Sequence, residues 1–204
     1  ARQERIRHVL CRHEQGAGFI AQGMARLTGR PGVCLATSGP GATNLLTAIA
    51  DAHLDSVPLI AITGQVPRDL AGTDAFQEVN TTALAGPITK GAFAAARSAD
   101  LLEIIPRAFA LAASGRPGPV LIDVPKDVQT ERARFAGWPQ PGRRQPAPRP
   151  EIADLDAAAE MIDAARRPIL YLGGGVIHAG AAAEAVEFAE KASAPVVTSL
   201  MALG

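Results

Sequence analysis

The carboxylate best suited to proton transfer in this sequence is Glu14, in the segment Arg12-His13-Glu14-Gln15-Gly16. It lies where a strand-like segment ends and a helix-like segment begins. Ligands of open α/β sheets bind outside the carboxyl ends of the strands, and a carboxylate buried there has a raised pKa, so it can hold or donate a proton near neutral pH. A glutamate at the start of a helix also acts as a cap or as a partner of the helix dipole. Glu14 alone therefore does not decide between catalysis and helix stabilisation.

A glycine-rich turn follows at Thr37-Ser38-Gly39-Pro40-Gly41-Ala42-Thr43-Asn44. Glycines between a strand and a helix let a ligand approach the backbone closely and leave free amide groups directed at it. The segment matches neither the Walker pattern nor the dinucleotide fingerprint. It predicts either a ligand-binding turn or a tight turn that binds nothing.

Two further segments carry side chains suited to a substrate pocket. The segment 72–78 combines an aromatic ring, Phe76, with an amide, Gln77, and two carboxylates. It could wall a pocket, or Phe76 could anchor a surface loop. Lys126 follows an apolar strand-like run and would lie at the carboxyl end of that strand, where the alternative is a solvated lysine beside Asp127.

The elements that must position these side chains alternate between strand-like and helix-like patterns. Apolar runs predict strands at about 5–12, 33–37, 57–63, 91–96 and 120–124. Helical spacing of apolar residues predicts helices at about 15–28, after the turn at 38–41, and at about 99–113. This alternation is typical of an α/β fold, a doubly wound, mainly parallel sheet flanked by helices. We expect Gly29 and Ser98 to cap helices, Pro106 to kink one, and the irregular stretch 64–77 to be functional or disordered.

The composition changes between residues 137 and 150, where five prolines and three arginines predict an extended linker. We therefore expect an α/β domain over residues 1–136, a linker over 137–150, and the start of a second, Rossmann-like α/β domain over 151–204. In the second domain the patterns predict helices at about 153–165 and 179–192 and strands at about 169–172 and 195–199.

Composition and charge limit the classes of function. Hydrophobic residues make up 48% and charged residues 20% of the chain, as in soluble globular proteins. Twenty basic residues offset twenty acidic ones, so no net charge favours nucleic acid or an anionic membrane. No apolar run approaches the roughly 18 residues of a membrane span, and two cysteines give neither a disulfide framework nor a metal-ligand spacing. We expect a cytoplasmic protein, and we expect both ends of the sequence to be truncated because it lacks an initiator Met and a polar tail.

Six motifs occur in order along the first 128 residues: Arg-His-Glu-Gln-Gly-Ala, Ser-Gly-Pro-Gly-Ala-Thr-Asn, Thr-Gly-Gln-Val-Pro, Gly-Thr-Asp-Ala-Phe-Gln-Glu, Ser-Gly-Arg-Pro-Gly-Pro and Val-Pro-Lys-Asp-Val. This set resembles the pyrimidine-binding domain of the large catalytic subunit of acetolactate (acetohydroxyacid) synthase, a thiamine diphosphate-dependent enzyme. The resemblance is dense from residue 9 to 128. It continues more thinly through 171–175 and 198–204, which resemble the start of that family's central domain.

The resemblance implies a role for each matching residue. Glu14 matches the glutamate that hydrogen-bonds the aminopyrimidine ring of the cofactor and activates it. The residues expected to contact thiamine diphosphate are Glu14, Pro40, Asn44 and Gln77, and those expected to line the substrate pocket are Phe76, Gln77 and Lys126. The expected catalytic residues are Glu14, Gln77 and Lys126. The residues that match the family's FAD region are Arg116, Gly173, Gly174, Gly175, Thr198 and Leu200.

The implied reaction is decarboxylation of pyruvate and carboligation to a second 2-oxo acid, which gives acetolactate or acetohydroxybutyrate. The resemblance also implies Mg²⁺, FAD, a homodimer or dimer of dimers that shares the site between subunits, and a regulatory small subunit. These 204 residues alone should be inactive, because the family's diphosphate and magnesium site needs a Gly-Asp-Gly motif and an Asn-Asn pair, neither of which occurs here.

Two alternatives stay open. The first is a sister enzyme that uses thiamine diphosphate, such as an oxo-acid decarboxylase, an aldehyde lyase or a sulfoacetaldehyde acetyltransferase. A glyoxylate carboligase is disfavoured because Glu14 is present. The second is a module that binds FAD or thiamine diphosphate without catalysis, which a full-length gene without the Gly-Asp-Gly and Asn-Asn motifs would favour.

Overall fold

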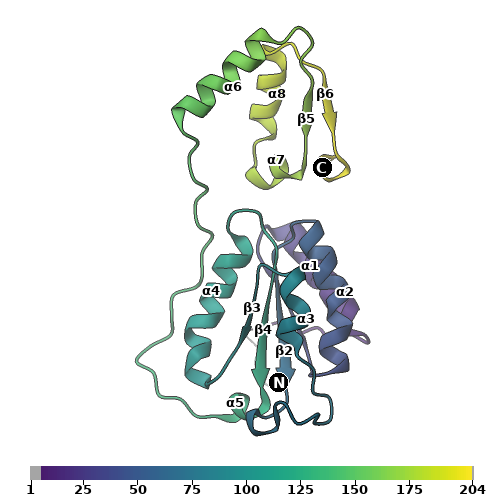
Figure 1. The fold of residues 1–204 in the computed structure, drawn as a ribbon, viewed down its shortest axis with the longest axis vertical. Helices are drawn as coiled ribbons and strands as arrows, with labels where there is room; N and C mark the ends of the chain where they lie inside the picture. The colour runs from purple at the N-terminus through teal and green to yellow at the C-terminus, as the bar shows by residue number, and fades with distance from the viewer. Residues whose placement is uncertain (1–5, 204) are drawn as a thin grey trace. The chain divides into compact units, whose positions relative to one another are not determined.

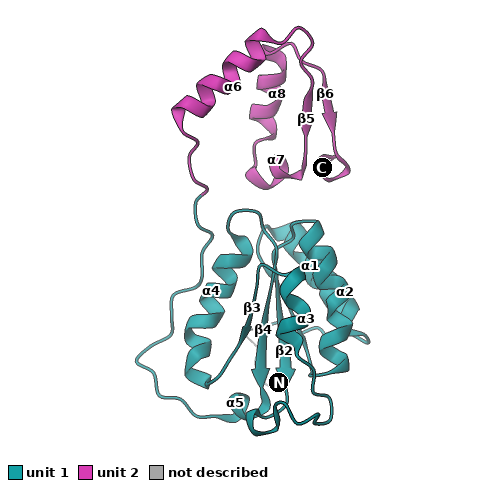
Figure 2. Ribbon diagram, viewed as in Figure 1, with its two compact units in different colours: residues 1–146 teal, residues 147–204 magenta. Residues whose placement is uncertain are grey.

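The computed structural model describes residues 6–203, and the chain forms two compact units, residues 1–146 and 147–204 (Figure 2). No helix in this described part is long and apolar enough to cross a membrane. The candidate residues of the six motifs all belong to the first unit.

A four-stranded parallel sheet forms the centre of the first unit. Its strands lie in the order β1 (Gly32–Ala36), β2 (Leu59–Gln65), β4 (Pro119–Pro125) and β3 (Gly91–Ala94). Every residue of β4 is buried, as expected for a central strand covered on both faces. All the strand pairs are parallel, so the prediction of an α/β fold with a mainly parallel sheet is confirmed.

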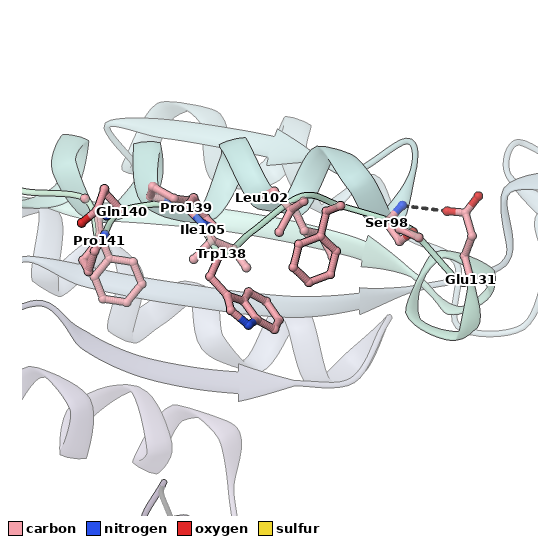
Figure 3. Close-up of a pocket in the computed structure, with 14 residues that line it drawn as sticks. Ser98, Leu102, Ile105, Glu131, Trp138, Pro139, Gln140 and Pro141 are labelled. Atoms are coloured by element: carbon pink, nitrogen blue, oxygen red, sulfur yellow. Dashed lines mark hydrogen bonds between the residues drawn. The ribbon is translucent and has the colours of Figure 1, made fainter.

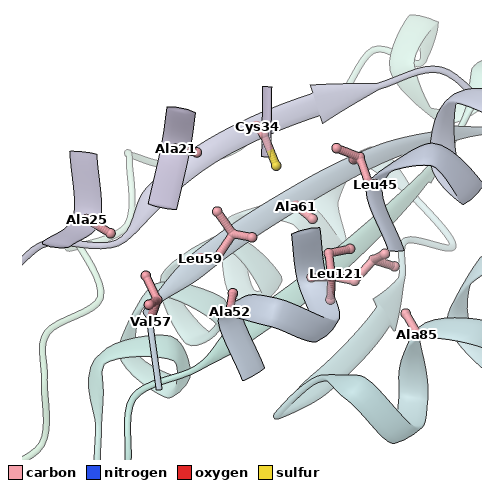
Figure 4. Packing of buried hydrophobic residues seen from close by; sticks show 11 residues of the cluster. Ala21, Ala25, Cys34, Leu45, Ala52, Val57, Leu59, Ala61, Ala85 and Leu121 are labelled. Carbon is pink, nitrogen blue, oxygen red and sulfur yellow. The ribbon is translucent and has the colours of Figure 1, made fainter. Parts of the chain in front are cut away.

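Helices cover both faces of this sheet (Figure 1). They are α1 (Glu14–Thr28), α2 (Pro40–Leu54), α3 (Thr81–Ala85), α4 (Leu101–Ala113) and the short α5 (Lys126–Thr130). Alternate residues of β2 enter two different cores, since Leu59 packs with α1, α2 and α3 whereas Ile60 packs with α4 and α5. The first core contains many small side chains, including Ala21, Ala25 and Ala52, which allow α1 and α2 to lie close to the strands (Figure 4).

The predicted helix signals were correct in part. Gly29 ends α1 in the left-handed conformation with φ 65°, and its N–H donates to the carbonyl of Ala25, so the predicted cap is confirmed. Ser98 is not the N-cap of α4. It begins a 3₁₀ turn, η3 (Ser98–Asp100), that leads into the helix, and its N–H is satisfied by the Glu131 carboxylate at 2.7 Å. The helix α4 continues through Pro106 without a break.

The predicted strand at 5–12 is wrong for residues 6–12, which form no strand, and residue 5 lies outside the described residues. An isolated extended segment needs a neighbouring strand to satisfy its backbone groups. No described strand pairs with this segment, and the apolar side chains of Ile6 and Leu10 are 74% and 87% exposed. The apolar pattern of residues 6–12 is therefore compatible with a strand, but whether a strand forms depends on a neighbouring strand with which it can pair.

The chain from 131 to 151 contains no helix or strand. Its first part nevertheless packs along α4, where the N–H of Gln145 donates to the Ser114 hydroxyl at 2.8 Å. Gly142 lies directly against this helix, because a Cβ atom there would approach the Pro106 carbonyl oxygen to 1.8 Å.

The second unit contains a two-stranded parallel sheet of β5 (Leu170–Leu172) and β6 (Val196–Thr198). Its helices are α6 (Ile152–Ala164), α7 (Gly174–Ala179) and α8 (Ala182–Lys191), and a 3₁₀ turn, η4 (Leu200–Ala202), follows β6. Two parallel strands joined by helices form a βαβ unit. The helix that we expected at 179–192 is present as α8, and a further short helix, α7, starts within the glycine run.

Candidate functional site

The candidate residues Glu14, Asn44, Gln77 and Lys126 gather near the carboxyl edge of the four-stranded sheet. The turn that carries Asn44 follows β1, the loop that carries Gln77 follows β2, and Lys126 follows β4. In a parallel sheet all these strand ends meet at one edge, which is where ligands of α/β proteins bind. The glycine-rich turn and the loop are in direct contact there.

Glu14 is the first residue of α1 and is half-buried. Its carboxylate accepts a hydrogen bond from the Asn44 Nδ2 atom of α2 at 3.1 Å. This bond, together with the backbone N–H at the helix start, holds the pKa of Glu14 below its usual value. The raised pKa that we expected for Glu14 is therefore wrong for this unit, because amide donors favour the ionised form more strongly than partial burial opposes it.

Gly41 keeps space open beside this carboxylate. A Cβ atom at position 41 would lie 3.5 Å from the Oε1 atom of Glu14 and only 2.7 Å from the Cγ2 atom of Thr37. A side chain there would fill the region between the first turns of α1 and α2. The glycine thus places no side chain beside the Oε1 atom of Glu14, while Asn44 binds the Oε2 atom.

The glycine-rich turn packs directly onto Gln77. Gly39 has φ 59° and ψ −118°, close to the values of the first central residue of a type II′ turn, which glycine adopts readily. A Cβ atom at position 39 would lie 2.8 Å from both the Cβ atom and the carbonyl oxygen of Gln77. Two motifs separated by almost forty residues therefore meet with no room between them.

The loop that carries Gln77 is closed by its own carboxylate. Glu78 accepts hydrogen bonds from the N–H groups of Gly72 and Ala75, the second at 3.0 Å. These bonds lower the pKa of Glu78, and the bond from Gly72 contributes most to the shift. Gln77 adopts φ 62°, which is uncommon for a residue other than glycine. Phe76 is 89% exposed, so it does not anchor the loop within this unit.

A buried polar network at the ends of β2 and β4 was missed by the sequence analysis. Asp123 is 4% exposed, and its two carboxylate oxygens accept hydrogen bonds from the Thr63 hydroxyl at 2.6 Å and the Gln65 side-chain amide at 2.9 Å. Burial raises the pKa of Asp123 above its usual value. The signal was present, because an aspartate interrupts the otherwise apolar strand 120–124, but only Lys126 was selected from that motif.

Lys126 is exposed at the start of α5. The neighbouring Asp127 does not pair with it. The Asp127 carboxylate instead binds the Nε atom of Arg68 at 2.6 Å, and this ion pair lowers the pKa of Asp127. The Lys126 ammonium group thus remains accessible near the carboxyl edge.

Arg116 lies apart from these residues, just before β4 and therefore at the opposite edge of the sheet. Its guanidinium group donates to the Ser56 hydroxyl at 2.7 Å and to the carbonyl of Leu54 at 2.9 Å. These contacts satisfy backbone carbonyls at the end of α2. The structure gives Arg116 a helix-capping role and does not bring it to Glu14.

In the second unit, the glycine run and Thr198 lie at the carboxyl ends of β5 and β6. The N–H of Ser199 donates to the carbonyl of Leu172 at 2.9 Å, which holds the two strand ends together. A Cβ atom on Gly174 would lie 3.0 Å from that of Met201, so the glycine permits close packing against η4. Leu200 is 83% exposed on that turn.

A cavity of about 570 Å³ lies away from Glu14, between α4 and the segment 131–142 (Figure 3). Its lining is mainly apolar and includes Leu102, Ile105 and Trp138. Residues 137–142 of this segment fall in the predicted linker, and the cavity was not predicted from the sequence. A smaller cavity of about 350 Å³ adjoins the ends of β1 and β2 and is lined in part by Thr37 and Thr63.

Two family models match this chain. Residues 1–84 match the model described as thiamine pyrophosphate enzyme, N-terminal TPP binding domain, and residues 155–204 match the central domain of the same enzymes. The two matched segments thus correspond to the N-terminal and central domains of thiamine pyrophosphate enzymes.

Individual relatives define the group more narrowly. The chain is 57% identical over 199 residues to the large subunit of acetolactate synthase isozyme 1 from Escherichia coli (strain K12), covering 98% of this chain and 35% of that protein. It is 54% identical over 204 residues to the acetolactate synthase large subunit of Corynebacterium glutamicum, covering 98% of this chain and 32% of that protein. It is 50% identical over 209 residues to the chloroplastic acetolactate synthase 3 of Brassica napus, covering 100% of this chain and 31% of that protein. The chain belongs to the acetolactate synthase large-subunit family, and it spans about a third of the length of these relatives.

Proposed function

We propose that the full-length protein containing this chain catalyses thiamine diphosphate-dependent decarboxylation of pyruvate and carboligation of the product to a second 2-oxo acid. The products would be acetolactate or acetohydroxybutyrate. The observation that carries the proposal is the arrangement of Glu14 at the carboxyl edge of the sheet, where Asn44 binds the Oε2 atom and Gly41 places no side chain beside the Oε1 atom.

The residues present fit thiamine diphosphate. When bound, the cofactor supplies a carbon nucleophile that attacks the keto group of a 2-oxo acid. Glu14 would exchange a proton with a ring nitrogen, and Asn44 would fix the direction of its carboxylate. The turn at Gly39 and Pro40 would allow the ring to approach the backbone closely, as glycine-rich turns do.

The substrate would lie toward Gln77 and Lys126. Lys126 offers an exposed positive charge to a substrate carboxylate, and Gln77 offers an amide held firmly by the turn at Gly39. Phe76 would contribute an apolar wall, because its ring is exposed and covers nothing within its own unit.

The proposal also covers the remaining cofactors and partners. Mg²⁺ would be held by ligands outside this chain. FAD would lie against Gly173, Gly175 and Thr198, where the backbone is open to close approach, and Arg116 is available only if its capping bonds are broken. Relatives named as large subunits support a regulatory small subunit, and the proposal also includes a homodimer or dimer of dimers. Two free thiols support a cytoplasmic location.

The test is acetolactate formation from pyruvate by the full-length protein, with thiamine diphosphate and Mg²⁺, with and without FAD. The variant Glu14→Gln should lower turnover by about two to four orders of magnitude, the effect of removing a proton-transfer contact. The matched control is Glu103→Gln, which changes an exposed glutamate in the first turn of α4. Near-normal turnover of Glu14→Gln would contradict the role of Glu14. Binding of thiamine diphosphate without acetolactate formation would instead indicate a sister enzyme.

A further inference from the structure

The Asp123 network extends from the centre of the sheet to the loop that carries Gln77. The side-chain amide nitrogen of Gln65 donates to the Asp123 carboxylate at 2.9 Å and to the Val79 carbonyl at 2.7 Å. An amide NH₂ group has two hydrogens, so both bonds form at once. The Gln65 amide oxygen accepts from the Val66 N–H at 2.9 Å, which fixes the third polar position of this side chain.

Val79 lies two residues after Gln77, so this bond holds the C-terminal end of the loop. The next residue, Asn80, caps α3 through the N–H of Ala83 at 3.1 Å, so the anchored segment leads directly into a helix. The backbone of Gln77 has no space to move toward Gly39. The position of Gln77 is thus defined by the glycine turn on one side and by Gln65 on the other.

Asp123 in turn determines the orientation of Gln65. A buried glutamine amide can rotate unless its partners distinguish nitrogen from oxygen. Asp123 offers only acceptor atoms when ionised and is itself fixed by the Thr63 hydroxyl. Together with the Val66 N–H it therefore favours the orientation in which Gln65 donates to Val79. Within the described residues Asp123 has no charged partner. Its two hydrogen bonds, to Thr63 and Gln65, therefore define its structural role.

We infer that Asp123 is a positioning residue that acts through Gln65 to hold the loop carrying Gln77 against the turn at Gly39. This inference rests on the proposed function, because it assigns the loop to the substrate side of that site. The competing explanation is that the network only stabilises the sheet. In that case its loss would lower stability without changing the kinetics in any specific way.

The experiment compares the half-buried Gln65 with the buried Gln22 in the full-length protein. Gln65→Met removes the bond to Val79, whereas Gln22→Met removes a bond of the same kind, from the Gln22 amide to the Ala48 carbonyl at 2.7 Å, between α1 and α2. Gln65→Met should lower kcat/KM for pyruvate by about 10- to 100-fold, as small displacements of positioned groups do. Gln22→Met should lower the thermal midpoint about as much as Gln65→Met does. It should, however, leave kcat/KM within about twofold of that of the unmodified protein.

Variants at Asp123 provide a second comparison. Asp123→Asn keeps an acceptor for Gln65 and can donate to the Thr63 hydroxyl, so it should retain most of the activity. Asp123→Ala should reproduce the kinetics of Gln65→Met. If Asp123→Ala does not fold, Gln65→Met, which changes a half-buried side chain, still carries the test.

A readout that does not depend on activity is hydrogen–deuterium exchange of the peptide covering 72–80. Exchange should rise in Gln65→Met and Asp123→Ala and stay unchanged in Gln22→Met and Asp123→Asn. Unchanged exchange in Gln65→Met would overturn the inference, as would faster exchange with unaltered kcat/KM. If the unmodified protein makes no acetolactate, the proposed function fails, whereas exchange still decides whether the network holds the loop.

Discussion

Replacing Gly39 with alanine should disturb both the fold and the site. Gly39 combines φ 59° with ψ −118°, a conformation that an alanine adopts only with strain of about 1–3 kcal/mol. The added Cβ atom would also lie 2.8 Å from the Gln77 Cβ and carbonyl oxygen, and overpacking of this kind costs about 1–3 kcal/mol more. Since the obstacle includes backbone, the loop itself must move. We therefore expect a loss of roughly 2–6 kcal/mol and a displaced Gln77.

The matched control is Gly29→Ala at the end of α1. Gly29 also has positive φ, 65°, but a Cβ atom there would meet nothing within 4 Å. Its replacement should therefore cost only the left-handed backbone conformation, about 1–2 kcal/mol. Both variants place an alanine at a positive φ angle, but only Gly39→Ala adds a Cβ atom that overlaps Gln77.

The assays are the midpoint of thermal unfolding and the steady-state kinetics of the full-length protein. Each kcal/mol lowers the midpoint by about 2–4 °C for a domain of 150–250 residues. Gly29→Ala should lower the midpoint modestly and leave kcat/KM unchanged, whereas Gly39→Ala should lower the midpoint further and reduce kcat/KM at temperatures well below it. Equal midpoints with unchanged kinetics in both variants would refute the argument that Gly39 is required for close packing on Gln77.

Three other predictions follow from individual contacts. Asn44→Ala should raise the pKa of Glu14 toward that of a free glutamate, which carbon-13 NMR titration would measure. It should also remove a contribution to stability that is present above the unfolded-state pKa of Glu14 and is lost as pH falls through its lower folded-state pKa. An unchanged Glu14 pKa would contradict the role of Asn44. Arg116→Ala should cost about 1 kcal/mol by uncapping α2 without loss of flavin, and loss of flavin at an unchanged midpoint would contradict the capping role. Burial raises the pKa of the Cys34 thiol to about 12, so peptide mapping after iodoacetamide treatment should find Cys34 alkylated only after unfolding and Cys11 alkylated in the native protein.

The fold could be predicted from the sequence wherever a segment is buried on both faces. The runs at 57–63 and 120–124 are apolar because helices cover both sides of β2 and β4, and their pattern depends little on the details of pairing. The segment 6–12 has a similar local pattern, but forming a strand requires a neighbour, and sequence alone does not supply one. The glycine run at 173–175 reads as a loop because glycine disfavours helix interiors, yet it leads into α7 since small residues permit the contact with η4.

The candidate site was chosen from the sequence by residue type, whereas the contacts between its residues could not be predicted. The resemblance selected Glu14 and Asn44, while the bond between them joins positions 30 residues apart and is visible only in three dimensions. Asp123 was overlooked because its role depends on Thr63 and Gln65, which are about sixty residues away in the sequence. Contacts of this length follow from the register of parallel strands, since β2 and β4 place Thr63 directly opposite Asp123.

The direction of the Glu14 pKa shift has a consequence for the proposed chemistry. Within this unit the carboxylate is half-exposed and bonded by an amide, and both conditions favour ionisation. Holding a proton near neutral pH requires the opposite conditions, namely exclusion of water around the carboxylate oxygen that Asn44 does not bind. An apolar ring placed over the space beside Gly41 would exclude that water and raise the pKa. If the proposed function holds, the proton affinity of Glu14 depends on what covers it, and we expect the Glu14 pKa to rise when the cofactor is bound.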